Sequence, residues 1–248
     1  MTEDSPAQEL DLIKSEYLDP APDRRVDQRL NEFVADYVIP RMGRGHALEL
    51  GVGDFVWTPR LLEQFESVTT LDASKELIRA REAECDDPNW YTVETYFEDY
   101  VPESRFDVVF ATYVLEHVDD VSAILDKAFE DWLKPGGRIA TVVPHALSLH
   151  RRLGVAMGLF SDPGTLGDTD RRMGHKRVMT HLDMEELMQK AGFQIIEQQG
   201  MISKALPNSQ LTSCSDEQLR GLFNLGLDLP IEYSGAIFFH GQKSAQSF

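Results

Sequence analysis

The sequence is poor in cysteine, which limits how the chain can be stabilised. Its two cysteines, Cys85 and Cys214, lie far apart and form neither a CxxC pair nor the disulfide framework of a small secreted domain. A chain of 248 residues is long enough to bury a large hydrophobic core without such bridges. We therefore expect a reduced, cytoplasmic protein that folds as a single domain over residues 1–248.

Long apolar segments are also missing from the sequence. No run approaches the roughly 18 to 20 apolar residues that a membrane-spanning helix requires. The first 19 residues carry six acidic side chains and one lysine, whereas a secretory signal starts with basic residues and continues with an apolar stretch. We expect neither an export signal nor a membrane partner.

Basic residues are scarce, since 24 Lys and Arg stand against 42 Asp and Glu, for a net charge of -18. Such a chain repels a phosphate backbone, so we expect no nucleic-acid partner, and a cationic or neutral ligand fits better. Residues 150–177 reverse this balance with six basic residues against three acidic ones. Because arginine pairs well with carboxylates and phosphates, this segment predicts an acceptor with an anionic group.

Helical and strand-like segments alternate along the chain, which predicts an α/β fold. Seven strands are expected, at residues 46–50, 67–71, 90–93, 106–112, 138–143, 193–199 and 235–240. Amphipathic or capped helices are expected at residues 26–38, 58–65, 74–84, 121–132 and 181–191. Residues 1–40 are predicted to form an N-terminal helical cap. Residues 145–180 are too long for an ordinary connection and predict a lid insertion after the fifth strand.

A glycine turn and a distant aspartate indicate a nucleoside site. Gly51 and Gly53 follow the strand at 46–50, and Asp72 ends the next strand, where an acidic side chain can accept hydrogen bonds from ribose hydroxyls. A dinucleotide fingerprint would need a third glycine at Val56, and Asp54 would repel a pyrophosphate. The pattern therefore favours an adenosine ligand without phosphates.

With these features the sequence resembles the class I S-adenosylmethionine-dependent methyltransferases. The resemblance covers about residues 28–200 and rests on LELGVG at 48–53, LDAS at 71–74, FDVVFATYVLEHV at 106–118 and LKPGGR at 133–138. It implies a Rossmann-like, seven-stranded, mostly parallel sheet with helices on both faces, and a transferase that uses S-adenosylmethionine. The cofactor-binding residues that it implies are Glu49, Gly51, Gly53, Asp72, Ala73, Ser74, Tyr96, Phe97, Thr112, Tyr113 and His117.

Two aromatic residues are added to this predicted cofactor site on other grounds. Phe55 stands where the family usually has glycine, so we expect it to crowd the methionine end of the cofactor together with Trp57. Tyr17 lies in an acidic N-terminal segment that we expect to fold over the cofactor.

Methyl transfer from a sulfonium is an in-line displacement that depends mainly on proximity and alignment. The predicted acceptor is a small molecule, such as a sugar, an amino acid or a natural-product precursor. If its proton must leave, the candidate catalytic residues are His145, His175 and Tyr113, and His145 is preferred because it follows the strand at 138–143. The predicted acceptor-binding residues are Arg151, Arg171, Arg172 and His181. No metal is expected, and a homodimer is an open assembly state.

Two other functions stay open at this point. In the first, the cofactor's own amine attacks a different carbon on sulfur to give azetidine-2-carboxylate and methylthioadenosine, because Phe55 and Trp57 could bend the methionine moiety or stabilise its cation. In the second, the chain binds the cofactor without catalysis and acts as a partner subunit. Fold alone does not separate these alternatives from methyl transfer.

Overall fold

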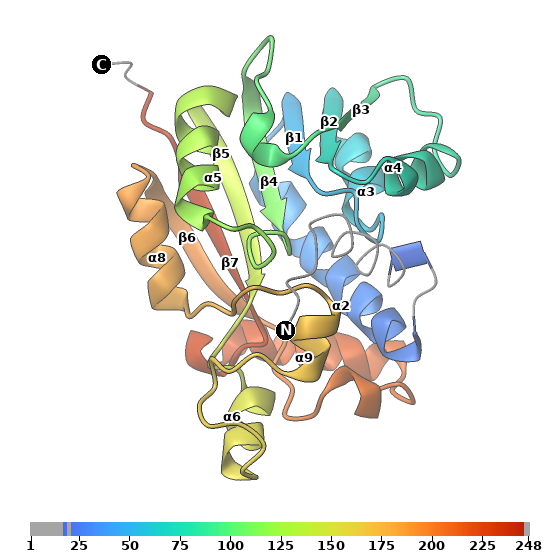
Figure 1. Ribbon diagram of the computed structural model, residues 1–248, viewed down its shortest axis with the longest axis vertical. Coiled ribbons are helices and arrows are strands. Elements are labelled where there is room, and N and C mark those ends of the chain that lie inside the picture. Colours follow the sequence, from blue (N-terminus) through green and yellow to red (C-terminus); the bar gives the residue numbers. More distant parts are fainter. Residues whose placement is uncertain (1–16, 19–20, 246–248) are drawn as a thin grey trace, which may run out of the picture.

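A single seven-stranded sheet organises the computed structural model, which describes residues 17–18 and 21–245 (Figure 1). The strands are β1 (His46–Leu50), β2 (Ser67–Asp72), β3 (Trp90–Glu94), β4 (Phe106–Thr112), β5 (Leu133–Pro144), β6 (Gln194–Met201) and β7 (Ala236–Gln242). Their order is β3-β2-β1-β4-β5-β7-β6, and β7 runs antiparallel to both β5 and β6. The predicted α/β fold with seven mostly parallel strands is confirmed.

Helices cover both faces of the sheet because neighbouring residues of each strand point to opposite sides (Figure 1). In β4, Val108 and Phe110 join one hydrophobic cluster, and Val109 joins the other. The first cluster includes residues of α2 (Pro22–Val38), α3 (Trp57–Gln64) and α9 (Asp216–Asp228). The second includes residues of α5 (Val121–Lys127), a π-helical turn (Ala128–Trp132) and α8 (His181–Lys190).

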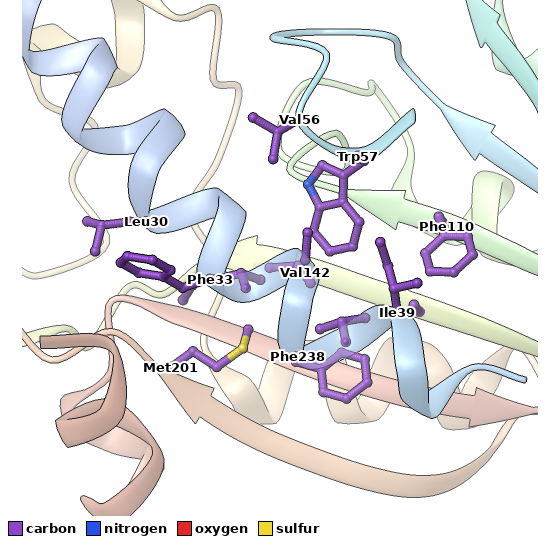
Figure 2. Packing of buried hydrophobic residues seen from close by; sticks show 14 of the residues in the cluster. Leu30, Phe33, Ile39, Val56, Trp57, Phe110, Val142, Met201 and Phe238 are labelled. Atoms are coloured by element: carbon purple, nitrogen blue, oxygen red, sulfur yellow. The ribbon is translucent and has the colours of Figure 1, made fainter. Parts of the chain in front are cut away.

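Helix α2 is part of the main core. Figure 2 shows Phe33 of this helix above the strands that carry Val142, Met201 and Phe238. The ring centroids of Phe33 and Phe223 of α9 are 6.1 Å apart, so the two helices pack against each other as well as against the sheet. The predicted N-terminal helix starts earlier than expected, because Pro22 takes the first helical turn, where its missing N–H costs no hydrogen bond.

Other boundaries follow from local hydrogen bonds. The Ser74 hydroxyl accepts from Leu77 N and caps α4 (Lys75–Glu82), which packs beside β2 and β3. Strand β5 starts before the predicted residues 138–143 and includes Gly136 and Gly137, and its register with β4 shifts between Phe106 and Val108. The strand therefore continues through the two glycines, with a local irregularity in its pairing, rather than beginning after them.

Residues 145–180 connect the end of β5 to the start of α8 outside the sheet. The segment contains α6 (Leu149–Ala156) and α7 (Asp168–Arg172), and an isolated parallel bridge joins His145 to Met179 at its two ends. Its action as a lid stays a prediction, as does the cap at residues 1–40, of which 1–16 and 19–20 lie outside the described residues. Within residues 17–18 and 21–245, no helix has the length and apolar character that crossing a membrane demands.

Two glycines of α9 give a matched test of this packing. An added Cβ at Gly226 would lie 2.1 Å from Ile202 N, whereas one at Gly221 meets nothing within 4 Å. We expect Gly226→Ala to destabilise the fold by about 2 kcal/mol or more, because α9 must move off the end of β6. Gly221→Ala should stabilise it by up to about 1 kcal/mol through helix propensity. Urea unfolding measures both, and equal shifts in the two variants would contradict the packing.

Candidate active site

A cavity of about 780 Å³ lies along the edge of the sheet where the parallel strands end. It is lined by residues at or directly after the ends of β1, β2, β3, β4 and β5, and by the start of β7. Strand β1 lies between β2 and β4, so the chain order reverses at this edge. Open α/β sheets bind ligands at this kind of switch point.

The glycine turn after β1 forms one wall of the cavity. Gly51 and Gly53 have φ of 79° and 43°, in the left-handed region that glycine adopts at little cost. Arg81 of α4 donates to Gly53 O at 3.1 Å and to Tyr17 O at 3.0 Å, which fixes the turn and the N-terminal segment together. The ring of Tyr17 lies close to Gly53 and lines the cavity.

Asp72 connects the ends of β1 and β2. Its carboxylate accepts from Val52 N at 3.0 Å and from Ser74 N at 2.7 Å, and its side chain lines the cavity with that of Ala73. Burial raises the pKa of Asp72, while the two backbone hydrogen bonds oppose this shift. The side chain of Ser74, predicted to bind the cofactor, instead caps α4 outside the cavity lining.

Glu49 is a buried carboxyl group at the end of β1. The hydroxyls of Thr58 and Thr70 each donate to its Oε2 at 2.7 Å. Burial nevertheless raises the pKa of Glu49 to about 7, because the low-dielectric surroundings disfavour the charged form. A positively charged ligand in the cavity would favour ionisation of this group.

The lining as a whole is acidic and fits a cationic cofactor. Ten carboxyl residues line the cavity: Asp23, Asp27, Glu49, Asp54, Asp72, Glu98, Glu116, Asp119, Asp168 and Asp170. Four residues there carry Lys or Arg side chains: Arg24, Arg151, Lys176 and Lys204. This imbalance attracts a sulfonium and repels phosphates, in agreement with an adenosine ligand that carries a positive charge.

Most of the other predicted cofactor residues also line the cavity: Tyr96, Phe97, Thr112, Tyr113 and His117. Tyr113 has φ of 53°, which is unusual for a bulky residue and marks a tight turn after β4. Burial raises the pKa of Tyr113 well above its ordinary value, so its phenol keeps its proton at neutral pH. Tyr113 is therefore suited to donate a hydrogen bond and unsuited to act as a base.

Phe55 lies elsewhere than predicted. Its ring packs against that of Trp90 in a tilted arrangement with centroids 5.2 Å apart, and it is not part of the cavity lining. The residue adopts a φ of 61°, the conformation for which glycine is usual, and this turn directs the ring toward β3. The prediction that Phe55 crowds the methionine end is wrong, whereas Trp57 does line the cavity.

His145, the preferred catalytic histidine, also lies elsewhere than predicted. His145 is 1% exposed, with its Nδ1 3.1 Å from Ser234 O and its Nε2 3.4 Å from His181 Nδ1. Both histidines lie outside the cavity lining, and burial lowers the pKa of His145 to about 4. After the end of β5 the His145 side chain points into the protein interior. Neither His145 nor His181 therefore faces an acceptor in the cavity. His175, the third candidate, does line the cavity.

The predicted basic lid is largely neutralised. Arg151 is 5% exposed, pairs with Asp170 and donates to Pro163 O and Thr165 O at 3.0 and 2.9 Å. Arg172 pairs with Asp23, and Arg171 lies 4.0 Å from Asp168. Arg171 and Arg172, both predicted to bind the acceptor, lie outside the cavity lining, whereas Arg151 lines the cavity with its guanidinium already paired to Asp170.

Several residues of the cavity lining were not predicted from the sequence. Arg24, Asp27 and Asn31 project from one side of α2, with spacings of three and four residues that place them on a single helical face. Lys204 and Asn208 come from the loop after β6. The spacing on α2 was a usable signal, but the sequence alone does not show that this polar face meets a cavity rather than solvent.

The turn after β1, the carboxylate at the end of β2 and the cavity at the switch point define a class I methyltransferase fold, whose cofactor is S-adenosylmethionine. The family described as a methyltransferase domain matches residues 23–198. Because this match covers well over half of the chain, the chain belongs to that family of methyltransferase domains.

Individual proteins agree with this assignment. A ubiquinone biosynthesis O-methyltransferase of Xylella fastidiosa is 32% identical over 132 residues, which make up 50% of this chain and 53% of that protein. The chain thus spans about half the length of this curated relative.

Two solved structures share the fold. A complex of the Haloferax volcanii Trm112 activator with a methyltransferase gives a TM-score of 0.69 at 16% identity and covers 98% of this chain and 100% of that one. The N-methyltransferase NodS of Bradyrhizobium japonicum, in complex with S-adenosylhomocysteine, gives a TM-score of 0.60 at 13% identity. The match covers 96% of this chain and 97% of that one.

The role of Asp72 is tested with S-adenosylhomocysteine and isothermal titration calorimetry. Asp72→Asn keeps the shape but loses the charge and cannot accept both backbone hydrogen bonds, so we expect the Kd to rise about 10- to 100-fold. Ser74→Ala removes the α4 cap, which should lower stability by about 1 kcal/mol and leave the affinity unchanged. Unchanged affinity in Asp72→Asn would contradict the role.

Glu49 gives a prediction about pH. Its pKa rises from 4.5 in the unfolded chain to about 7 in the ligand-free fold, so its favourable contribution is complete below pH 4.5 and is lost as the pH rises through 7. The wild type should lose up to about 3 kcal/mol over this window relative to Glu49→Gln, whose side chain does not titrate. Urea unfolding at several pH values measures the difference, and parallel curves would refute it.

Proposed function

We propose that this methyltransferase acts on a small molecule that is bound in the same cavity as the cofactor. The supporting observation is that one cavity is lined both by most of the predicted cofactor residues and by a second set of residues from α2, residues 150–176 and residues 202–210. Its volume of about 780 Å³ lies toward the upper end of the ~300–1,000 Å³ that small-molecule sites span. A cofactor and an acceptor can share such a space.

The second part of the cavity offers polar groups that can orient an acceptor. Asn208 Nδ2 donates to Asp27 Oδ1 at 2.6 Å, Lys204 Nζ donates to Asn208, and Arg24 pairs with Asp27. Burial leaves the Lys204 ammonium poorly solvated and thereby lowers its pKa. A polar ligand group could replace the missing solvation. This network joins α2 to the loop after β6 at the cavity wall.

Apolar side chains complete the acceptor region. Leu153, Met157, Leu159 and Phe160 line the cavity from residues 145–180, and Leu206 lines it from the loop after β6. Met157 and Leu159 are largely exposed. An acceptor with an apolar body and a few polar groups fits this combination, as is usual for small-molecule sites.

The chain's own residues bind and align the reactants. S-adenosylmethionine supplies a methyl group on a sulfonium when it is bound. Asp72 is placed to accept from the ribose hydroxyls, Glu49 lies toward the methionine end, and Phe97 lies at the adenine edge. Of the two histidines predicted as catalytic, His145 and His175, only His175 lines the cavity, so we place it beside the acceptor. Because an in-line displacement needs alignment above all, positioning accounts for most of what the protein has to provide.

The remaining partner and location assignments are part of the same proposal. A small-molecule acceptor agrees with the relative that is named for ubiquinone biosynthesis. A cytoplasmic location and a homodimer stay predictions. Cyclisation of the cofactor loses the Phe55 part of its motive, because Phe55 lies against Trp90 outside the cavity lining, and only Trp57 of the two aromatic residues remains there. No contact favours a catalytically silent role.

The direct test is incubation of the purified protein with S-adenosylmethionine and a library of small acceptors, followed by mass spectrometry. We expect S-adenosylhomocysteine and a product heavier by one methylene unit only when an acceptor is present. Methylthioadenosine formed without an acceptor would instead indicate cyclisation. Cofactor binding without turnover of any acceptor would favour the silent role.

Lys204 separates acceptor binding from cofactor binding. Lys204→Met should raise the KM for the acceptor about tenfold, the effect expected for loss of one charged hydrogen bond, and leave the affinity for S-adenosylhomocysteine unchanged. The matched control is Lys190→Met on α8, where the ammonium pairs with Glu186 at the surface. Equal KM values in the two variants would place the acceptor elsewhere.

A further inference from the structure

We propose that Glu116, His117 and His175 form a binding site for one divalent transition-metal ion, of the zinc or iron type, on the wall of the cavity. The three residues offer one ligand atom each, and these atoms lie within 4.8 Å of one another. All three residues line the cavity. Two imidazoles and one carboxylate are a common donor set for Zn²⁺ and for non-haem Fe²⁺.

The carboxylate is the strongest sign of a missing partner. Glu116 is 1% exposed, and among the described residues its Oε2 has no hydrogen-bond partner. A buried carboxylate oxygen without a partner is costly, so such groups in folded proteins are normally paired or bound to a metal. The unpaired oxygen lies in the same small cluster as two imidazole rings rather than at the protein surface.

The two histidines are oriented as metal ligands usually are. His117 Nδ1 lies 3.3 Å from Gly174 O, and His175 Nδ1 lies 3.1 Å from Asp170 Oδ1. With each Nδ1–H directed at an oxygen, Nε2 carries the lone pair that an ion can take. Second-shell hydrogen bonds of this kind fix the tautomer and ring orientation of metal-binding histidines.

Backbone contacts hold the two ligand-bearing segments together. Lys176 N donates to Glu116 O at 2.8 Å, and His175 N donates to Asp170 O at 2.8 Å. The guanidinium of Arg177 donates to Val118 O and, at 2.8 Å, to Asp119 O. The ligands therefore come from a framework that already exists before an ion binds, which lowers the cost of ordering them.

The site has to contract slightly when it is occupied. Ligand atoms around a tetrahedral zinc lie roughly 3.4 Å apart, as follows from bond lengths of about 2.0–2.1 Å. Atoms up to 4.8 Å apart would have to approach by up to about 1.4 Å, through rotation of their side chains, to reach this spacing. The rings of His117 and His175 already meet edge to face with centroids 4.9 Å apart.

Nearby charges permit a cation at this place. Arg24 and Lys176 are two cations near His117, and they pair with Asp27 and Asp119 respectively. Asp170 adds a carboxylate behind His175. The cluster thus combines a buried negative charge with cations that already have partners.

The role of the ion rests on the proposed function. Three protein ligands leave at least one coordination position free, as in catalytic metal sites, and the ligands line the cavity. An acceptor with an oxygen donor, such as a hydroxyl or a carboxylate, is the class that this position would bind. The ion would hold the acceptor oxygen in place and favour loss of a hydroxyl proton to water.

The test uses tag-free protein, stripped with a chelator and titrated with Co²⁺ while visible absorption is recorded. We expect one ion per chain, d–d bands typical of a four- or five-coordinate site, and displacement by Zn²⁺. Glu116→Gln and His175→Ala should each weaken Co²⁺ binding by at least about 100-fold, since changes in second-shell partners alone cost about 10- to 100-fold. The control is His46→Ala, a surface histidine whose side chain is 49% exposed.

Calorimetry with S-adenosylhomocysteine on the same samples separates this inference from the proposed function. If the variants bind S-adenosylhomocysteine but lose Co²⁺, the metal site is supported. No Co²⁺ binding by wild type that binds S-adenosylhomocysteine overturns the metal site alone. Equal Co²⁺ binding by wild type, Glu116→Gln and His175→Ala overturns it too. Failure of the wild type to bind S-adenosylhomocysteine counts against the proposed function, whatever the Co²⁺ result.

Discussion

The burial of carboxyl groups around one cavity is the constraint on which the site depends. Burial raises the pKa of Glu49, Asp54, Asp72 and Glu116, because each loses solvation of its charged form. Few lysine and arginine side chains share this lining, and several of them pair with other acids. A ligand with a positive charge supplies the cation that these carboxyl groups lack, so a sulfonium cofactor suits the cavity.

The sheet brings these groups together although they are distant in sequence. Parallel strands end at the same edge, so Gly51 after β1, Asp72 at the end of β2 and Thr112 at the end of β4 meet there. The hydrogen bond from Val52 N to the Asp72 carboxylate ties the first two ends to each other. Helix α2 then closes the side of the cavity with the polar face that includes Arg24. The same packing that forms the core thus positions the ligand-binding groups.

The sequence predicted the parts that depend on local pattern. Apolar runs located the seven strands. The interval from Gly51 to Asp72 lies within one βαβ unit, and both residues line the cavity. The sequence failed where the outcome depends on which way a side chain turns. His145 follows a strand end as expected, yet its ring faces Ser234 and His181 inside the protein. Arg151 was predicted to bind the acceptor, but a pairing with Asp170 that no local pattern reveals engages its guanidinium.

A crystal structure of the protein with S-adenosylhomocysteine tests the central claim most directly. The account predicts that the ribose hydroxyls lie within hydrogen-bond distance of the Asp72 carboxylate, with the amino-acid end directed toward Glu49 and Gly51. It also predicts open space beside the sulfur that continues to His175 and Lys204. A ligand bound away from the end of β2, or a sulfur enclosed on all sides by protein, would contradict the account.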